Sequence, residues 1–510
     1  MWQLIHNGVL VPERYKPVGL HITVRGRRIP LNRDQEEMAV AWAKKQGTEY
    51  VNDKVFVRNF LTDFSQALGV NPPLTLSEVD FTEVIKFVEE EKQRKLEISR
   101  EEKKRLAEER KRLREELREK YGYAIVDGVR VEISNYVVEP PGIFMGRGKH
   151  PLRGRWKPPV SEEDVTLNLS PDAPRPPGKW REIVWRPDNM WIAKWDDKLR
   201  GVEKYVWLAD SSHLKQRKEI EKFNLAAKLE REIERLRDHI AANLNSPDPK
   251  RRRIATVCYL IDVLKMRVGD EKDKDEADTV GATTLKARHI KIEGNRVRFN
   301  FLGKDYVRWE KEATMPDQVI ANLKEYVANA KSSLFPGVRS DVVSAFLSEV
   351  SPGLTAKVFR TYHATTVVKE YLKKASVTVE QPEYYKRHVA TMANLQAAVE
   401  CNHKKKIPKN WRESLKKKEE RLKELKERWR AKKNPKTLEA IRKLQLKIEE
   451  MKATRDYNLR TSLKSYIDPR AYYEWGRKVG YDWKLYYPKA LQKKFSWLEG
   501  ENAGKAELKR

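Results

Sequence analysis

The segment WRESLKKKEERLKELKERW, Trp411 to Trp429, carries large or long side chains at alternating steps of four and three. After Asn434-Pro435 the same steps return from Ile441 to Met451. Such spacing places one stripe of side chains along a helix, and the residue before a proline disfavours helix. The stretch therefore predicts two helices that fold back on each other as an antiparallel coiled-coil hairpin.

The hairpin is strongly basic, and so is the whole chain. Residues 404–436 contain sixteen Lys and Arg against five Glu, and the 510 residues carry a net charge of +30. This excess favours a nucleic-acid or anionic-membrane partner. A membrane role is not expected, because no run of eighteen apolar residues occurs and the start, MWQLIHNGVLVPERY, lacks the order of a signal peptide.

Several common sites are absent from the sequence. It has no C-x-x-C pair, no H-E-x-x-H and no G-x-x-x-x-G-K-[ST] motif, and its two cysteines, Cys258 and Cys401, imply no disulfide framework. We therefore expect no metal site and no nucleotide-triphosphate loop. The cysteine count fits a reducing compartment.

Towards the N-terminus the composition changes several times. Residues 1–85 mix short β-like runs with an amphipathic helix, and residues 87–120 are almost continuously charged, which predicts solvent-exposed helices with a capping box at Ser99 and Glu102. Proline and glycine then mark loops over 140–177, and closely spaced tryptophans alternate with polar residues as half-buried strands do: Trp180, Trp185, Trp191, Trp195 and Trp207.

Residues 201–404 are mostly helical, with one predicted β-hairpin over 289–309 and a tight second turn at 302–305. We predict a multidomain α+β protein. Its parts are a mixed N-terminal module over 1–200, a mainly helical core over 201–404, the coiled-coil hairpin over 405–455 and a small helical C-terminal domain over 456–510.

Beyond the hairpin lies SLKSYIDPR, Ser462 to Arg470, which carries Tyr466. A tyrosine beside an Asp-Pro turn is commonly a packing residue, but in a polyanion binder it is also a candidate nucleophile for a phosphodiester. Attack would gather negative charge on the phosphate oxygens and on the leaving oxygen. Without a metal, arginines are needed to stabilise the charge on the phosphate oxygens, and a Lys or His is needed to protonate the leaving oxygen.

Four residues suit those roles. Arg267 is expected at the end of an apolar helix and before a glycine, Lys304 lies at the second turn of the hairpin, and His403 begins the basic hairpin. Arg360 comes three residues after Lys357, so both are expected on one helix face. Each has an ordinary alternative, since helical arginines form ion pairs, hairpin lysines are solvated and histidines cap helices.

The segments that carry these residues are similar, in order and wording, to those of the eukaryotic-type DNA topoisomerase IB family. They are EPPGIFMGRGKHP, KMRVGDE, DEADTVGATTLKARHI, FNFLGKDYVRW, GLTAKVFRTYHA, ECNHKK and SLKSYIDPR, and they span nearly the whole chain. The resemblance implies that Tyr466 is the nucleophile and that Arg267, Lys304, Arg360 and His403 form the catalytic pocket.

The same resemblance implies the reaction and its partner. Tyr466 would form a 3′-phosphotyrosyl bond while Lys304 protonates the 5′ oxygen, so supercoils of either sign would relax without ATP and without an essential metal, with Mg at most a stimulant. Residues 1–200 would be a cap that clamps double-stranded DNA against the core of a monomer. Further DNA contacts are carried over to four positions: Arg147, Lys357, Asp305 and Thr461.

The chain also departs from the family pattern. Ser465 and Asp270 stand where the eukaryotic enzymes usually have Asn, and Arg147 and Asp305 match further positions of the family's camptothecin pocket. We therefore expect reduced camptothecin trapping. The long charged N-terminal tail is missing, which suggests a short archaeal-type member, cytoplasmic and nucleoid-associated, without a nuclear signal.

Two other functions remain open at this stage. A tyrosine recombinase uses a similar Arg, Lys, His and Tyr set but acts at specific sites, and the N-terminal match argues against it. A non-enzymatic coiled-coil DNA-binding protein would share the basic hairpin and would not need Tyr466.

Overall fold

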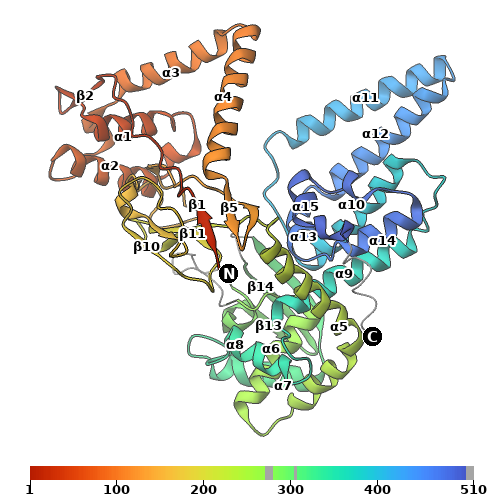
Figure 1. The fold of residues 1–510 in the computed structure, drawn as a ribbon. Helices are drawn as coiled ribbons and strands as arrows, with labels where there is room; N and C mark the ends of the chain where they lie inside the picture. The colour runs from red at the N-terminus through yellow and green to blue at the C-terminus, as the bar shows by residue number, and fades with distance from the viewer. Residues whose placement is uncertain (147, 270–279, 304–306, 501–510) are drawn as a thin grey trace. The chain divides into compact units, whose positions relative to one another are not determined.

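The computed structural model describes residues 1–146, 148–269, 280–303 and 307–500. The chain divides into two compact units, Met1–Lys215 and Gln216–Arg510, and it mixes helices with small sheets as an α+β protein (Figure 1). Within the described ranges, none of the helices is long and apolar enough to cross a membrane.

Three helices of the first unit pack together, and the fourth, α4, is charged and exposed along its length. α1 and α2 pack with α3 and the sheet β3-β2-β4 around buried aromatic side chains such as Trp42 and Phe60. α4 has no buried residue, and Ser99 caps it by accepting a hydrogen bond from the Glu102 amide at 3.1 Å, which is one half of the predicted capping box. The bounds are α1 Arg33–Ala43, α2 Lys54–Leu68, α3 Thr82–Glu97 and α4 Arg100–Tyr121.

Short strands make up the rest of this unit. Besides β3-β2-β4 they form the sheets β1-β5-β6, β10-β9-β11-β12 and β7-β8. Trp191 and Trp195 are buried on β11, as the alternation of tryptophans predicted, whereas Trp207 at the end of β12 is 37% exposed. The strand bounds are β1 Leu4–His6, β2 His21–Val24, β3 Arg27–Pro30, β4 Val79–Asp80, β5 Tyr123–Val126, β6 Val129–Glu132, β7 Gly142–Ile143, β8 Trp156–Lys157, β9 Thr166–Asn168, β10 Glu182–Val184, β11 Trp191–Asp196 and β12 Glu203–Trp207.

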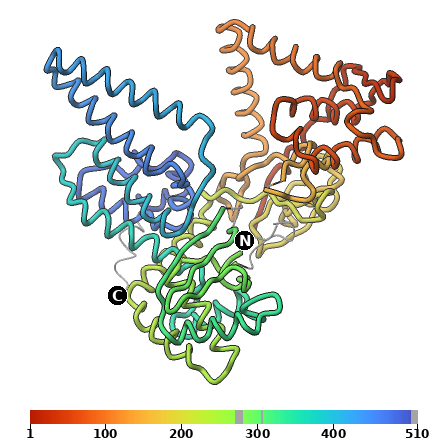
Figure 2. Tube along the Cα trace, turned by 180° about the vertical axis from the view of Figure 1, so that it is seen from behind, coloured from red at the N-terminus to blue at the C-terminus, as the bar shows by residue number. Residues whose placement is uncertain are grey.

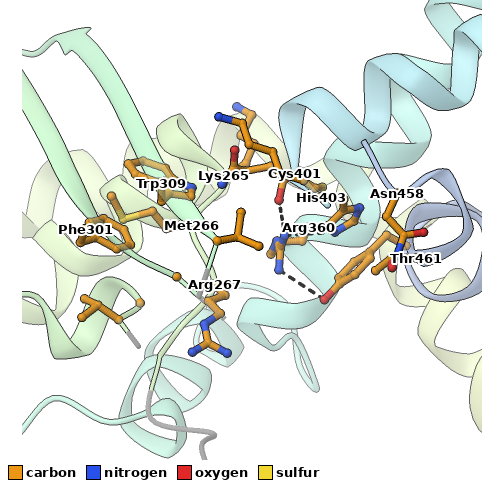
Figure 3. Close-up of a pocket in the computed structure, with 17 residues that line it drawn as sticks. Lys265, Met266, Arg267, Phe301, Trp309, Arg360, Cys401, His403, Asn458 and Thr461 are labelled. Atoms are coloured by element: carbon orange, nitrogen blue, oxygen red, sulfur yellow. Dashed lines mark hydrogen bonds between the residues drawn. The ribbon is translucent and has the colours of Figure 1, made fainter. Parts of the chain in front are cut away.

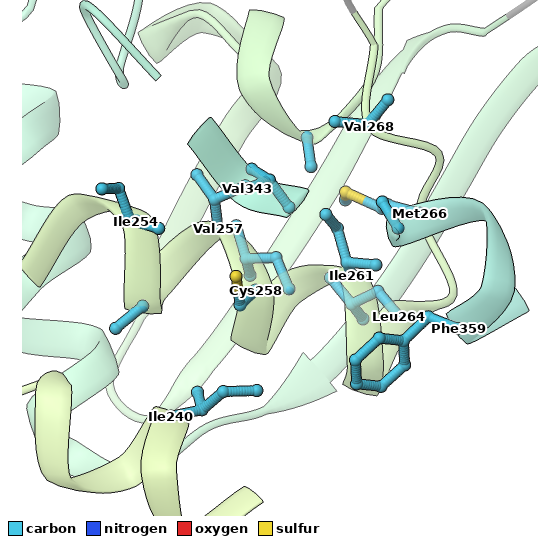
Figure 4. Close-up of a cluster of buried hydrophobic side chains, with 14 of the residues drawn as sticks. Ile240, Ile254, Val257, Cys258, Ile261, Leu264, Met266, Val268, Val343 and Phe359 are labelled. Atoms are coloured by element: carbon cyan, nitrogen blue, oxygen red, sulfur yellow. The ribbon is translucent and has the colours of Figure 1, made fainter. Parts of the chain in front are cut away.

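The first core of the second unit surrounds α6, Pro249–Leu264. Asp248 caps this helix, and most of its apolar side chains, among them Val257, Ile261 and Leu264, are buried against neighbouring helices (Figure 4). Burial of this many aliphatic groups makes α6 a rigid support. The neighbouring helices are α5 His213–Asn243, α7 Asp317–Asn329, α8 Ser340–Ser348 and α9 Ala356–Lys374.

The predicted β-hairpin is part of a larger sheet. β13 (Ile290–Glu293) and β14 (Arg296–Leu302) pair antiparallel as predicted, and β15 (Arg308–Thr314) adds a third strand against β14. The sequence prediction stopped at Trp309, because the residues after it alternate less clearly. At the second turn the Gly303 amide donates to the Val307 carbonyl at 2.8 Å, and residues 304–306 lie outside the described ranges.

The heptad pattern corresponds to α11 (Trp411–Ala431) and α12 (Pro435–Ala453), which lie side by side and antiparallel (Figure 2). α12 buries Ile441 and Ile448 and contacts α10 (Glu383–Glu400), whereas α11 has no buried residue. The remaining helices pack with α9 and α10 around a second core: α13 Leu459–Ser465, α14 Arg470–Val479 and α15 Lys489–Lys494.

Candidate active site

Tyr466 is the first residue after α13, and its backbone is held from two sides. Its amide donates to the Ser462 carbonyl at 2.9 Å, which closes the last turn of the helix. The Thr365 hydroxyl on α9 accepts from the Asp468 amide at 3.0 Å and lies 3.4 Å from the Tyr466 carbonyl. The phenol is therefore carried on a short, anchored segment.

Arg360 on α9 points at this phenol from a buried position, with only 8% of the residue exposed. One terminal nitrogen donates to the Tyr466 hydroxyl at 3.3 Å and the other donates to the Cys401 carbonyl at 2.9 Å (Figure 3). The guanidinium carbon lies 4.6 Å from the centre of the tyrosine ring. A permanently charged fork is thus fixed beside the hydroxyl.

His403 follows α10 in a tight turn in which Asn402 adopts a left-handed conformation, φ +52°. The His403 amide closes the end of α10 on the Ala398 carbonyl, while its Nδ1 lies 2.7 Å from the Ser462 hydroxyl and its ring centre 5.1 Å from that of Tyr466. Burial, and then the charge of Arg360, lower the pKa of His403 to about 3. The imidazole is therefore neutral near pH 7 and can donate one hydrogen bond.

Arg267 reaches the same cavity from another segment and lies on the other side of Arg360 from His403 in the view of Figure 3. The sequence prediction placed it at the end of the apolar helix. This is wrong by three residues, because α6 ends at Leu264 and Lys265 turns left-handed at φ +57°.

Because Arg267 lies beyond α6, close contacts with Gly281 hold its backbone in place of helical hydrogen bonds. The Ala282 amide donates to the Arg267 carbonyl at 2.9 Å, and an added Cβ at Gly281 would lie 2.4 Å from the Gly269 Cα and 2.7 Å from the Arg267 oxygen. Only glycine allows two backbones to approach this closely.

These side chains line one cavity of about 240 Å³ in the second unit. Arg267, Arg360, His403 and Tyr466 all face it, and the exposed Thr461 lines its rim. The structure therefore brings together four of the five predicted catalytic residues. Four other predicted positions lie outside the described ranges: Lys304, Arg147, Asp270 and Asp305.

Lys357 does not join this group. It lies on α9 three residues before Arg360, as predicted, but it is exposed, whereas Arg360 is buried against the cavity. The two residues share a helix face, as expected from their spacing of three, but they differ in exposure, and the DNA contact expected of Lys357 stays a prediction. Ser465 is half-buried and precedes Tyr466 at the end of α13.

Sequence reasoning missed two features that hold the predicted catalytic side chains in place. Ser462 is fully buried and its hydroxyl orients His403, although it stands in the quoted segment four residues before Tyr466. Gly281 packs against the backbone of Arg267. The position of Ser462, one helical turn before the candidate nucleophile, could have been used to predict its role. The contact of Gly281 with Arg267 joins two separate segments, and no sequence pattern indicates it.

Chemically, the cavity offers cationic and neutral donors around a phenol. Two guanidinium groups and a neutral imidazole suit the non-bridging oxygens of a phosphate diester, and the hydroxyl of Tyr466 suits attack on its phosphorus. Among the described residues, no group of three or more His, Cys, Asp or Glu side chains could hold a metal ion.

Comparison with known families covers almost the whole chain. Residues 1–208 match the eukaryotic DNA topoisomerase I DNA binding fragment, residues 211–435 match its catalytic core, and residues 438–503 match the C-terminal topoisomerase domain.

Individual relatives agree with these matches, each over 97% of this chain. DNA topoisomerase 1 beta of Arabidopsis thaliana is 35% identical, and the chain spans 58% of its length. The mitochondrial DNA topoisomerase I of Rattus norvegicus and DNA topoisomerase 1 of Homo sapiens are each 31% identical, with 90% and 70% of their lengths covered. The chain therefore belongs to the eukaryotic DNA topoisomerase I family.

Proposed function

We propose that the protein relaxes positive and negative DNA supercoils by cutting and resealing one strand, with Tyr466 as the nucleophile. The observation that carries this proposal is the hydrogen bond from buried Arg360 to the Tyr466 hydroxyl, beside His403. The family membership supports the same reaction class. Double-stranded DNA is the proposed partner, bound by a monomer.

In the proposed reaction the Tyr466 oxygen attacks a backbone phosphorus and its proton passes to solvent. The bond to the 5′ oxygen breaks with its electron pair, and the Lys304 ammonium protonates that oxygen. Arg267, Arg360 and neutral His403 donate to the non-bridging oxygens, where negative charge grows. Religation runs the same steps in reverse.

The energy balance follows from this chemistry. The 3′-phosphotyrosyl bond replaces one phosphodiester bond, so resealing needs no ATP, and the cationic donors take the place of a metal. While the strand is open, its free end rotates and releases supercoils of either sign. DNA contacts are proposed to be mostly to phosphate, which predicts weak sequence preference and strong salt dependence. The archaeal-type source and the cytoplasmic location stay predictions.

Plasmid relaxation in EDTA without ATP tests this function. We expect several unrelated supercoiled plasmids to relax, and Tyr466→Phe to abolish relaxation while it still binds DNA. Activity confined to one DNA site would favour a tyrosine recombinase instead. DNA binding without relaxation or adduct would favour a non-enzymatic coiled-coil protein.

A further inference from the structure

A cluster of three charged side chains lies behind the segment that carries Tyr466. Glu219 and Lys222 come from α5, and Lys494 is the last residue of α15. One Glu219 carboxylate oxygen lies 2.8 Å from the Lys222 ammonium and 3.0 Å from that of Lys494. The two lysine side chains are only 11% and 6% exposed.

Both ammonium groups also hold the backbone just before the tyrosine. Lys494 donates to the Lys464 carbonyl at 2.9 Å, and Lys222 donates to the Ser465 carbonyl at 3.1 Å. These are consecutive carbonyls at the end of α13, where a helix leaves its last oxygens without partners within the helix. The cluster therefore replaces the missing helical hydrogen bonds with charged ones.

The same face of α5 fixes the neighbouring segments. Gln216, three residues before Glu219, donates to the Lys493 carbonyl at 3.1 Å and to the Ser496 hydroxyl at 3.0 Å. Beyond the tyrosine, Arg470 donates to the Asn224 side chain at 2.9 Å. α5 thus contacts the chain on both sides of Tyr466.

The arrangement is electrostatically costly. Burial lowers the pKa of Lys222 to about 8 although Glu219 raises it, and the charges of Lys494 and Lys357 lower it further. Two ammonium groups share one carboxylate, so the cluster keeps a net positive charge with little solvent. Buried ion pairs of this kind are weak sources of stability.

We propose that Glu219, Lys222 and Lys494 are positioning residues that set the Tyr466 hydroxyl for attack by holding the two carbonyls before it. This rests on the proposed function of Tyr466. Release of either carbonyl would let the end of α13 unwind and move the phenol away from Arg360. The loss would fall on the chemical step and not on DNA affinity.

A single substitution at either lysine leaves Glu219 paired with the other lysine. Lys222→Met keeps the Glu219–Lys494 pair and frees the Ser465 carbonyl, and Lys494→Met keeps the Glu219–Lys222 pair and frees the Lys464 carbonyl. Lys222→Arg retains a donor for both partners. Lys386→Met is a matched control, because Lys386 is also buried and donates to a backbone carbonyl, that of Val379 at 2.8 Å, away from Tyr466.

The test is the rate of covalent adduct formation on a suicide duplex at saturating DNA, with DNA affinity measured separately in Tyr466→Phe backgrounds. We expect Lys222→Met and Lys494→Met each to slow adduct formation about 10-fold with unchanged affinity. Lys222→Arg should regain most of the rate and Lys386→Met should match the wild type.

Wild-type rates in both methionine variants, or an equal slowing in Lys386→Met, would overturn the positioning role. A wild-type protein that forms no adduct would instead contradict the proposed function, so the two failures are distinct.

Discussion

The two sides of the candidate active site are built in different ways. On one side Arg360, His403 and Tyr466 are linked to each other and to Ser462 by side-chain hydrogen bonds. On the other side the backbone of Arg267 is held by backbone contacts, because Gly281 lies close to its carbonyl and to Gly269. The first side is a side-chain network, and the second is a backbone clamp.

The two sides should respond differently to substitution. In the network, loss of one polar group removes a specific hydrogen bond and leaves the chain path unchanged. In the clamp, addition of a single carbon moves the backbone that carries Arg267. Substitutions that separate these two modes therefore test whether both sides serve one reaction.

The largest effect is expected for Arg360→Ala. It removes the charged donor to the Tyr466 hydroxyl and leaves the Cys401 carbonyl without that partner. Loss of one such donor should slow DNA cleavage by about 10² to 10³-fold. Single-turnover adduct formation measures this, with Lys357→Ala as the control, since that exposed lysine should affect DNA affinity and its salt dependence more than the cleavage step. A cleavage rate within about 3-fold of wild type, which is roughly the scatter of such measurements, would show that the Arg360 hydrogen bonds do not support cleavage.

Gly281→Ala should break the clamp. Its Cβ would fall 2.7 Å from the Arg267 oxygen, so the backbone at Gly281 or at Arg267 must shift. A displacement near 1 Å should cost about 10²-fold in cleavage. Gly294→Asn is the control, because Gly294 also lies in this unit, in the β13–β14 turn, faces open space and has a left-handed φ of +59° that Asn tolerates. If Gly281→Ala cleaves DNA as fast as this control, the close contact between Gly281 and the Arg267 backbone is not needed for cleavage.

Ser462→Ala should have a moderate effect, since it removes the partner that orients His403. We expect cleavage about 10-fold slower, within the range for a misplaced catalytic donor.

The low pKa of His403 gives a second measurement on the same side of the cavity. Because the folded protein holds this histidine neutral down to about pH 3, lowering the pH from 8 to 6 should not protonate it. NMR titration of the His403 ring checks this in wild type and in Ser462→Ala. A wild-type midpoint near the ordinary histidine value of about 6.5 would contradict the buried, neutral state.

The smallest effect is expected for Ser465→Asn, which restores the residue usual in the eukaryotic enzymes before the tyrosine. The backbone carbonyl that Lys222 contacts is unchanged, so cleavage should stay near wild type. Camptothecin-stabilised adducts should rise several-fold from a low wild-type level, and dose–response curves measure this. Strong trapping of the wild type at low dose would show that Ser465 does not limit sensitivity.

Local patterns predicted much of the fold. The heptad steps correspond to α11 and α12, the alternation around Gly294 corresponds to β13 and β14, and Ser99 caps α4. The third strand, β15, was predicted only as far as Trp309, because the residues after it alternate less clearly. The predicted domain boundaries stay predictions.

The site was recognised from the order of the sequence motifs more than from the chemical properties of the single residues. Each of Arg267, Arg360, His403 and Tyr466 has a common alternative role when read alone, and only the combination singled them out. Among the features that hold them, only Ser462 could have been suspected, from its place one helical turn before Tyr466. Gly281 and Lys494 act through contacts between segments that no local pattern links. Burial also could not be read, so the opposite exposure of Lys357 and Arg360 appeared only in the structure.

Mapping of the covalent DNA adduct to a single residue tests whether Tyr466 is the nucleophile. The wild-type protein should be trapped on a suicide duplex, digested and sequenced by mass spectrometry, with Tyr466→Phe in parallel. We expect a single phosphotyrosyl linkage at Tyr466 to the 3′ end of the cut strand, and no adduct in the variant. Attachment to any other residue, or an undiminished adduct in Tyr466→Phe, would contradict the account.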